Sequence, residues 1–207
     1  MKLSTAFAFV TALAFGTVGT VLAQQPKQSG GQASAQKSEK GEARGDAKHL
    51  KELAQANMAE VEAGKLAAQK AQNAEVKKFA QQMVDDHSKQ LEEIRKLAQA
   101  KSVELPSAPD SKHQRAMKKL QSASPDKFDH EYMQQMVKDH RDALKLAQRT
   151  AKDAKDSELK SSAQKAAPEI EKHLQMARQL ESSTKGAGKK SAGASKSSSG
   201  EKTGSAK

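Results

Sequence analysis

The sequence has 207 residues, a formal net charge of +11 at pH 7, no cysteine and no tryptophan. The lack of cysteine excludes disulfides, thiolate metal sites and cysteine nucleophiles. After the N-terminal segment the only aromatic side chains are Phe79, Phe128 and Tyr132. The core must therefore consist of Ala, Leu, Met, Val and Ile, which favours close-packed helices over a β-sandwich or barrel.

The first 23 residues have the pattern of an export signal. Lys2 gives a positive start, an apolar and small-residue run follows, and Ala23 ends the segment with the small residue that a signal peptidase prefers. A membrane span fits less well, because Ser, Thr and Gly interrupt the run and no basic cluster follows at once. We predict cleavage after Ala23 and a periplasmic or secreted protein without a transmembrane segment.

Two low-complexity stretches flank the central part of the chain. Residues 24–46 are rich in Gln, Ser, Gly and Lys and are predicted to be a disordered linker. Residues 182–207 contain six Lys and one Glu among Ser, Gly and Ala, and are predicted to be a disordered basic tail. The tail is either simply solvated or adheres to anionic envelope components. No aromatics accompany its lysines, which argues against sequence-specific nucleic-acid binding.

Residues 47–181 show helical periodicity and are predicted to form one all-α four-helix bundle. Asn73, Ser124-Pro125 and Asp156 are the expected starts of the second, third and fourth long helices. Pro106 and Pro109 break the pattern before a short extra helix over about 110–121. A connection of this length can cross the bundle and leave the second and third long helices parallel, whereas a tight return would make them antiparallel. We favour the crossover.

A heptapeptide repeat places histidines at core positions of two helices. Gln81–His87 reads QQMVDDH and Gln134–His140 reads QQMVKDH, 53 positions later. Counted from the helix turns, His87, His140 and His173 lie at one height, together with Glu60 or Asn57. The sequence therefore predicts a polar layer of three imidazoles and one oxygen-bearing side chain inside an apolar bundle.

This layer has two interpretations. Three imidazoles with Glu60 could bind a divalent metal such as Zn, Cu or Fe. Methionines one turn from each histidine would also suit Cu(I); they are Met83, Met136 and Met176. Alternatively, the histidines are neutral, hydrogen-bonded packing residues that fix the register of the helices.

Other polar residues are expected outside the layer. His49, His113 and His130 lie off the helical stripes and are interpreted as surface residues. Asp86 and Asp139 precede the layer histidines by one residue, so they are expected to face a groove or solvent.

Five segments of the central part form a distinctive combination: AEVEAGKLA (59–67), NAEVKKFAQQMVDDHSK (73–89), KSVELP (101–106), FDHEYMQQMVKDH (128–140) and PEIEKHLQMAR (168–178). In combination they resemble the exported bacterial domain-of-unknown-function family numbered 4142. The resemblance covers about residues 47–181 and implies export and a ferritin-like four-helix bundle, but no reaction. Ferritin-like di-iron sites use Glu-x-x-His pairs, and this chain has Val84, Val137 and Ile170 three residues before its histidines.

No set of nucleophile, base and orienting residue, no phosphate-binding glycine loop and no cofactor fingerprint is present in the sequence. The leading interpretation is a non-enzymatic, exported envelope protein that acts by binding or by structural protection. The second is a periplasmic metal-binding protein that uses Glu60, His87, His140 and His173. The sequence leaves the oligomeric state open.

Overall fold

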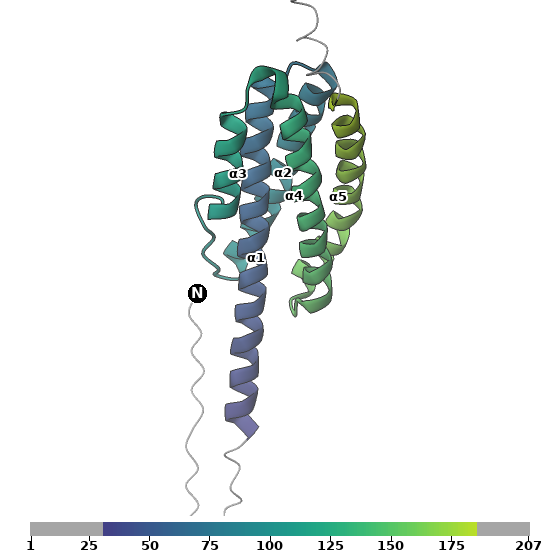
Figure 1. The fold of residues 1–207 in the computed structure, drawn as a ribbon. Helices are drawn as coiled ribbons and strands as arrows, with labels where there is room; N and C mark the ends of the chain where they lie inside the picture. The colour runs from purple at the N-terminus through teal and green to yellow at the C-terminus, as the bar shows by residue number, and fades with distance from the viewer. Residues whose placement is uncertain (1–30, 186–207) are drawn as a thin grey trace, which may run out of the picture.

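The computed structural model describes the backbone of residues 31–185 and the side chains of residues 41–185. Within these residues the chain forms five helices and no strand, as predicted (Figure 1). In chain order they are α1 (Gly31–Lys70), α2 (Ala74–Ala100), α3 (Ser111–Gln121), α4 (Pro125–Asp153) and α5 (Ser157–Thr184). None of the described helices is long and apolar enough to cross a membrane.

The four long helices form two antiparallel hairpins, α1–α2 and α4–α5, which pack more extensively within themselves than against each other. The segment from the end of α2 through α3 returns along the bundle, so that α2 and α4 run in the same direction (Figure 1). Lys101, after α2, forms an ion pair with Asp156 at the start of α5. At the other end of the bundle, the backbone N–H of Asn73 donates a hydrogen bond to Asp129 of α4. The crossover prediction is confirmed.

The helices begin where their capping residues predict. The side chain of Asn73 accepts hydrogen bonds from the first backbone N–H groups of α2, and Asp110 and Asp156 do the same for α3 and α5. Pro125 occupies the first turn of α4, where its missing N–H has no helical partner to lose. α5 continues through Pro168 to Thr184.

Each hairpin turn is fastened by an aspartate from the other hairpin. The Asp129 carboxylate accepts hydrogen bonds from the backbone N–H of Gln72, at 3.0 Å, and of Asn73, at 2.7 Å. At the opposite end, Asp46 of α1 accepts from the N–H groups of Lys155, at 3.0 Å, and Asp156, at 2.8 Å. These charge-assisted bonds satisfy backbone donors in both turns and fix the ends of the two hairpins relative to each other.

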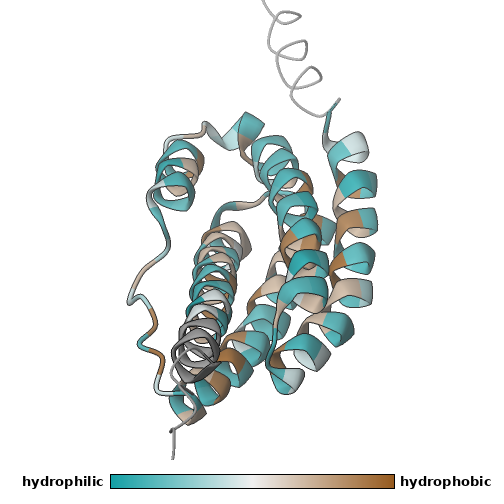
Figure 2. Cartoon of the chain, turned by 90° about the horizontal axis from the view of Figure 1, so that it is seen from below, coloured by the Kyte–Doolittle hydropathy of each residue, from teal (hydrophilic) through white to brown (hydrophobic). Residues whose placement is uncertain are grey.

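The apolar core is divided into two clusters. Figure 2 shows hydrophobic and hydrophilic residues alternating along the helices. One cluster contains the aromatic side chains Phe79, Phe128 and Tyr132, and the other is aliphatic, around Leu50 and Leu159. At the α1–α2 contact, a Cβ on Gly64 would lie 2.9 Å from Val84 Cγ2 and 3.0 Å from the Ala80 carbonyl oxygen, so glycine permits this close approach.

Two predicted boundaries differ from the structure. α1 begins at Gly31, so residues 31–46 are helical where a disordered linker was expected. The expectation considered only the lack of apolar side chains to bury. Ala, Gln, Glu and Lys are good helix formers, however, and extending an existing helix adds one hydrogen bond per residue without a new nucleus. α5 likewise continues to Thr184, three residues into the expected tail. The predicted signal, residues 24–30 and residues 186–207 lie outside the described part of the chain.

Candidate metal centre

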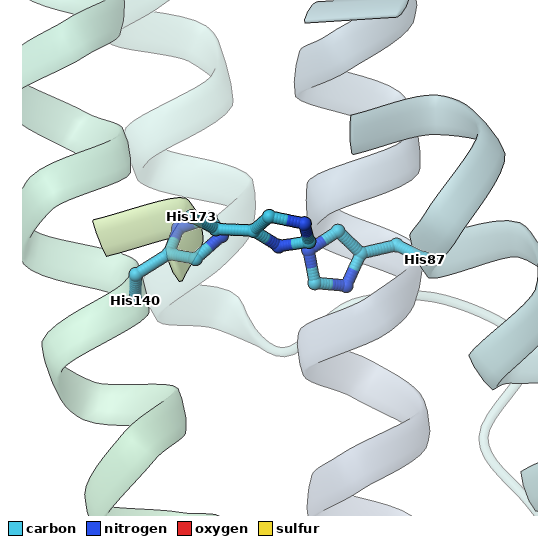
Figure 3. Close-up of side chains that lie close together, drawn as sticks. All are labelled: His87, His140 and His173. Atoms are coloured by element: carbon cyan, nitrogen blue, oxygen red, sulfur yellow. The ribbon is translucent and has the colours of Figure 1, made fainter. Parts of the chain in front are cut away.

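Three buried histidines from three helices meet inside the bundle. α2 supplies His87, α4 supplies His140 and α5 supplies His173, and their rings point toward one another (Figure 3). The ring centroids are 5.5–5.6 Å apart, and one nitrogen of each ring lies within 4.8 Å of one nitrogen of each of the others. The residues are only 3%, 0% and 3% exposed. The predicted meeting of the three imidazoles is thus present; we call them the histidine triad.

The outward nitrogen of His87 is held by an amide of α1. His87 Nδ1 lies 2.9 Å from Asn57 Oδ1. The Asn57 amide is itself oriented, because its Nδ2 donates to the Leu53 carbonyl oxygen at 2.8 Å. Asn57 Oδ1 can only accept, so His87 Nδ1 carries the proton and donates it. His87 Nε2 is then unprotonated and holds a free lone pair.

The other two histidines are held by acceptors in the same way. His140 Nδ1 donates to the Met136 carbonyl oxygen, one turn earlier in α4, at 2.9 Å. His173 Nε2 donates to the Asp86 carboxylate at 3.2 Å. The protonated nitrogen is therefore Nδ1 in His140 and Nε2 in His173, which leaves a lone pair on His140 Nε2 and on His173 Nδ1.

The three nitrogens with free lone pairs are all buried and unpartnered. His87 Nε2, His140 Nε2 and His173 Nδ1 have no hydrogen-bond partner among the described residues. A buried polar atom without a partner ordinarily costs about 1–3 kcal/mol, and here three such acceptors share one interior layer. Together they offer three lone pairs to one electron-pair acceptor.

Burial keeps the triad neutral. It lowers the pKa of His87 well below the usual value, with further lowering by His140 and His173, and lowers the pKa of His140 to about 4. Burial also lowers the pKa of His173, although the Asp86 carboxylate partly offsets this effect. Because unfolded histidine takes up a proton near pH 6.5, the neutral triad favours folding above that pH. This contribution is lost as the pH falls toward the folded pKa values.

Glu60 is buried beside the triad but is not part of it. Its Oε1 lies 3.8 Å from His140 Nδ1, the nitrogen that donates to Met136, and its Oε2 has no partner among the described residues. Burial, reinforced by Asp139, raises the pKa of Glu60 well above its usual value. Burial and the Glu60 carboxyl likewise raise the pKa of Tyr132. The predicted fourth ligand thus lies on the outer side of His140, and the group of nitrogens within 4.8 Å does not include it.

The methionines predicted as soft neighbours lie mainly in the apolar core. Met83 and Met136 are fully buried in the aromatic cluster, and Met176 is half-buried against it. The backbone carbonyl of Met136 nevertheless takes part in the site, because it orients His140. The side chains of Met83, Met136 and Met176 thus contribute to the aromatic cluster of the core, and their role as soft neighbours of a metal stays a prediction.

Asp86 and Asp139 each line a groove, as expected, but neither is simply solvated. Asp86 also accepts a hydrogen bond from His173, and Asp139 is only 8% exposed. Adjacent residues of a helix point about 100° apart. Inside a bundle both directions can meet another helix, which the expectation overlooked. The occurrence of Asp before both repeat histidines was the signal in the sequence that could have identified Asp86.

The remaining described histidines lie outside the triad, as expected, but are half-buried rather than fully exposed. His49 Nδ1 lies 3.1 Å from Thr150 Oγ1, His130 Nδ1 lies 3.3 Å from Thr184 Oγ1, and His113 Nδ1 lies 2.9 Å from Asp110 Oδ1. Each pairs near a helix end or at the edge of the bundle, so none adds a ligand to the triad.

The donor set fits a transition metal. Nitrogen ligands bind Zn²⁺ at about 2.0–2.1 Å, so three imidazoles around one ion have nitrogens roughly 3.4 Å apart. The present separations are within 4.8 Å, at most about 1.4 Å more than this value. Histidine ligands in metal sites characteristically donate their second N–H to a carboxylate, carbonyl or similar acceptor, and all three members of the triad do so.

Fold and site together define an all-helical bundle with three buried imidazoles that face one another. The chain belongs to the family described as Domain of unknown function (DUF4142), which matches residues 31–180. This confirms the family resemblance seen in the sequence.

Comparison with solved structures finds a similar fold in CopM in the Cu(II)-bound form. The TM-score is 0.59 and the identity 18%, and the match covers 67% of this chain and 96% of that one. At this identity the likeness concerns the fold. None of the curated proteins compared with the chain matches it.

Proposed function

We propose that the protein binds one transition-metal ion through His87 Nε2, His140 Nε2 and His173 Nδ1. The observation that carries the proposal is that all three nitrogens are buried, unprotonated and without a partner within residues 41–185, while the opposite nitrogen of each ring is held by an acceptor. Imidazole ligands must be neutral to bind a metal. The lowered pKa values of the triad meet this condition at neutral pH without loss of a proton.

A purely structural polar layer accounts less well for these contacts. Histidines that fix helix register are expected to bond to one another or to neighbouring polar groups, because buried polar groups are nearly always satisfied. In this bundle each ring bonds outward only. Glu60 Oε2 and Tyr132 Oη, the nearby groups that could have satisfied the layer, are also without partners among the described residues.

Copper is the metal we expect to bind most tightly. Imidazole suits copper, zinc and iron, and affinity for a given nitrogen site rises to Cu²⁺ and falls again at Zn²⁺. CopM, which shares the fold, holds Cu(II) in its solved structure. The predicted export signal would place the protein in the periplasm or outside the cell, where it would act as a binding protein for this metal.

The test is a titration of the mature chain, residues 24–207, after removal of metal with a chelator. We expect one equivalent of Cu²⁺ per chain by elemental analysis, and nitrogen hyperfine structure in the electron paramagnetic resonance spectrum. The double variant His87→Gln/His140→Gln should lose this equivalent. The matched control His49→Gln/His130→Gln removes two half-buried histidines outside the triad and should keep it.

Two results would overturn the proposal. One is a wild-type chain that takes up neither Cu²⁺ nor Zn²⁺ in stoichiometric amount. The other is binding that survives in the variant without His87 and His140, because the metal would then lie elsewhere. Circular dichroism of each variant verifies that the helices are retained.

A further inference from the structure

The lone-pair side of the triad is sealed from solvent. All three unpartnered nitrogens are buried. Two grooves on the side of α2 and α5 reach the layer from outside it. The larger is lined by Asn57 and Glu60 and the smaller by Asp86, and each of these side chains lies beside a nitrogen on the outward side of the triad. Water in either groove therefore contacts the back of the triad and not the centre where the lone pairs meet.

Apolar side chains lie above and below the triad along the bundle. On α2, Met83 precedes His87 by one turn and belongs to the aromatic cluster, whereas Leu91 follows it by one turn and belongs to the aliphatic cluster. The ring of Phe79 lies 6.5 Å from the ring of His140, centroid to centroid. The triad is therefore a thin polar layer between the two apolar clusters, and its centre is dry.

A dry centre with three nitrogens suits some ions better than others. Zn²⁺ sites with three protein ligands add a water or substrate as the fourth ligand, and Cu²⁺ prefers four or more donors in a tetragonal arrangement. Cu(I) has a filled d shell and is stable with three donors. Because water does not reach the lone-pair nitrogens, the triad matches the coordination of Cu(I) better than that of either divalent ion.

The charge of the ion leads to the same choice. The free-energy cost of taking an ion out of water rises with the square of its charge, so a dry layer disfavours a divalent ion more than a monovalent one. Within residues 41–185, the carboxylate that accepts a hydrogen bond from the triad is that of Asp86. One carboxylate compensates the single charge of Cu(I) but only half the charge of Cu²⁺.

We propose that the triad is a Cu(I) site, which binds Cu(I) through three nitrogens and without water, more tightly than it binds Cu²⁺ or Zn²⁺. This inference rests on the proposed function and specifies the oxidation state of the metal. The preference comes from the number of nitrogens and from the dryness of the layer. The methionine thioether groups are not required for it.

The first test measures the affinity of the mature chain for both oxidation states. Cu(I) is titrated without oxygen, with ascorbate present, against the chelator bicinchoninate, and Cu²⁺ is titrated against nitrilotriacetate. Equilibrium is verified by approach from both directions, because the buried site can exchange metal slowly. We expect a Kd for Cu(I) at least about 100-fold below that for Cu²⁺, which raises the reduction potential of the bound couple by about 120 mV above that of aqueous copper.

The second test counts the donor atoms around Cu(I). The X-ray absorption spectrum of the Cu(I)-loaded chain at the copper edge should show three nitrogen neighbours and no sulfur. A sulfur neighbour would assign the preference to a methionine. A fourth nitrogen or oxygen neighbour would show that the centre of the triad is open to a further ligand. Either result overturns the inference.

Two substitutions of one residue separate dryness from sulfur chemistry. Met83 is fully buried one turn before His87. Met83→Leu removes the sulfur and keeps the position apolar, so it should keep the preference for Cu(I). Met83→Gln has a similar length but brings a polar amide to the layer, so it should reduce the preference at least about tenfold. Circular dichroism verifies that both variants fold.

The outcomes separate the two proposals. A wild-type chain that binds Cu²⁺ as tightly as Cu(I), or more tightly, overturns this inference and leaves the proposed function in place. The same holds if Met83→Leu loses the preference, since the thioether would then be its source. A chain that binds copper in neither oxidation state overturns the proposed function and this inference with it.

Discussion

Replacing His140 with leucine should remove metal binding without destabilising the metal-free protein. His140 is fully buried, and leucine has a similar volume. If the triad exists for a metal, its empty form contains lone pairs that cost free energy. Removing one of these lone pairs should then leave the stability of the metal-free protein unchanged or raise it. If the layer exists for packing, the same substitution should lower that stability.

The expected change in unfolding free energy follows from the contacts of the His140 ring. Loss of the unpartnered Nε2 removes a cost of about 1–3 kcal/mol. Loss of the hydrogen bond from Nδ1 to the Met136 carbonyl oxygen removes about 1 kcal/mol of stabilisation. That carbonyl lies inside α4 and keeps its helical partner. The metal-free His140→Leu variant should therefore be unchanged or more stable by up to about 2 kcal/mol.

The assay is thermal unfolding followed by circular dichroism at pH 7.5, with a chelator and then with Cu²⁺. For a chain of this length, a gain of 1 kcal/mol raises Tm by about 2–4 °C. Wild type should gain about 2.7 kcal/mol at a metal concentration of 100 Kd, and the variant should gain nothing. A metal-free variant less stable than wild type by 2 kcal/mol or more would refute this reasoning and favour a packing layer.

Three further predictions concern the surroundings of the site. Asp86→Ala should weaken Cu²⁺ binding about 10–100-fold in a competition titration by removing the acceptor of His173, and the exposed neighbour Asp85→Ala should leave it unchanged. When the pH falls from 7.5 to 5.5, the metal-free His140→Leu variant should lose about 1.4 kcal/mol less unfolding free energy than wild type, as measured by urea unfolding. The reason is that the variant lacks one histidine with a lowered pKa. Equal losses in the two proteins would contradict the assigned pKa shift. Gly64→Ala should lower the unfolding free energy by about 1 kcal/mol, since the added Cβ meets a carbonyl oxygen at 3.0 Å. Gly45→Ala, with nothing within 4 Å, should raise it by about 0.5–1 kcal/mol.

The level of the histidines was predictable because helix geometry is regular. A rise of 1.5 Å per residue converts the distance from a turn into a height, and capping residues such as Asn73 marked the turns. The length of the segment containing α3 also favoured a crossover. Because His87 and His140 lie near the middle of their helices, they were expected at one level whether the two helices are parallel or antiparallel.

The partners of the triad were less predictable, because they depend on rotation about the helix axes. The sequence placed Asn57 and Glu60 at the correct height but could not distinguish which of them bonds to His87. Asp86 lines a groove, as expected, but its hydrogen bond with His173 of α5 was not predicted. The helical state of residues 31–46 was missed for another reason, because it depends on backbone propensity rather than on burial.

The crossover has a mechanical consequence for a chain without cysteine. It places His87 and His140 in different hairpins, 53 residues apart in the sequence. An ion bound as proposed would link the two halves of the bundle through these side chains. Unlike a disulfide, it would bind the folded site and leave the unfolded chain unrestricted, so its stabilisation would rise with the concentration of free metal. Metal supply would then determine how tightly the two hairpins are held together.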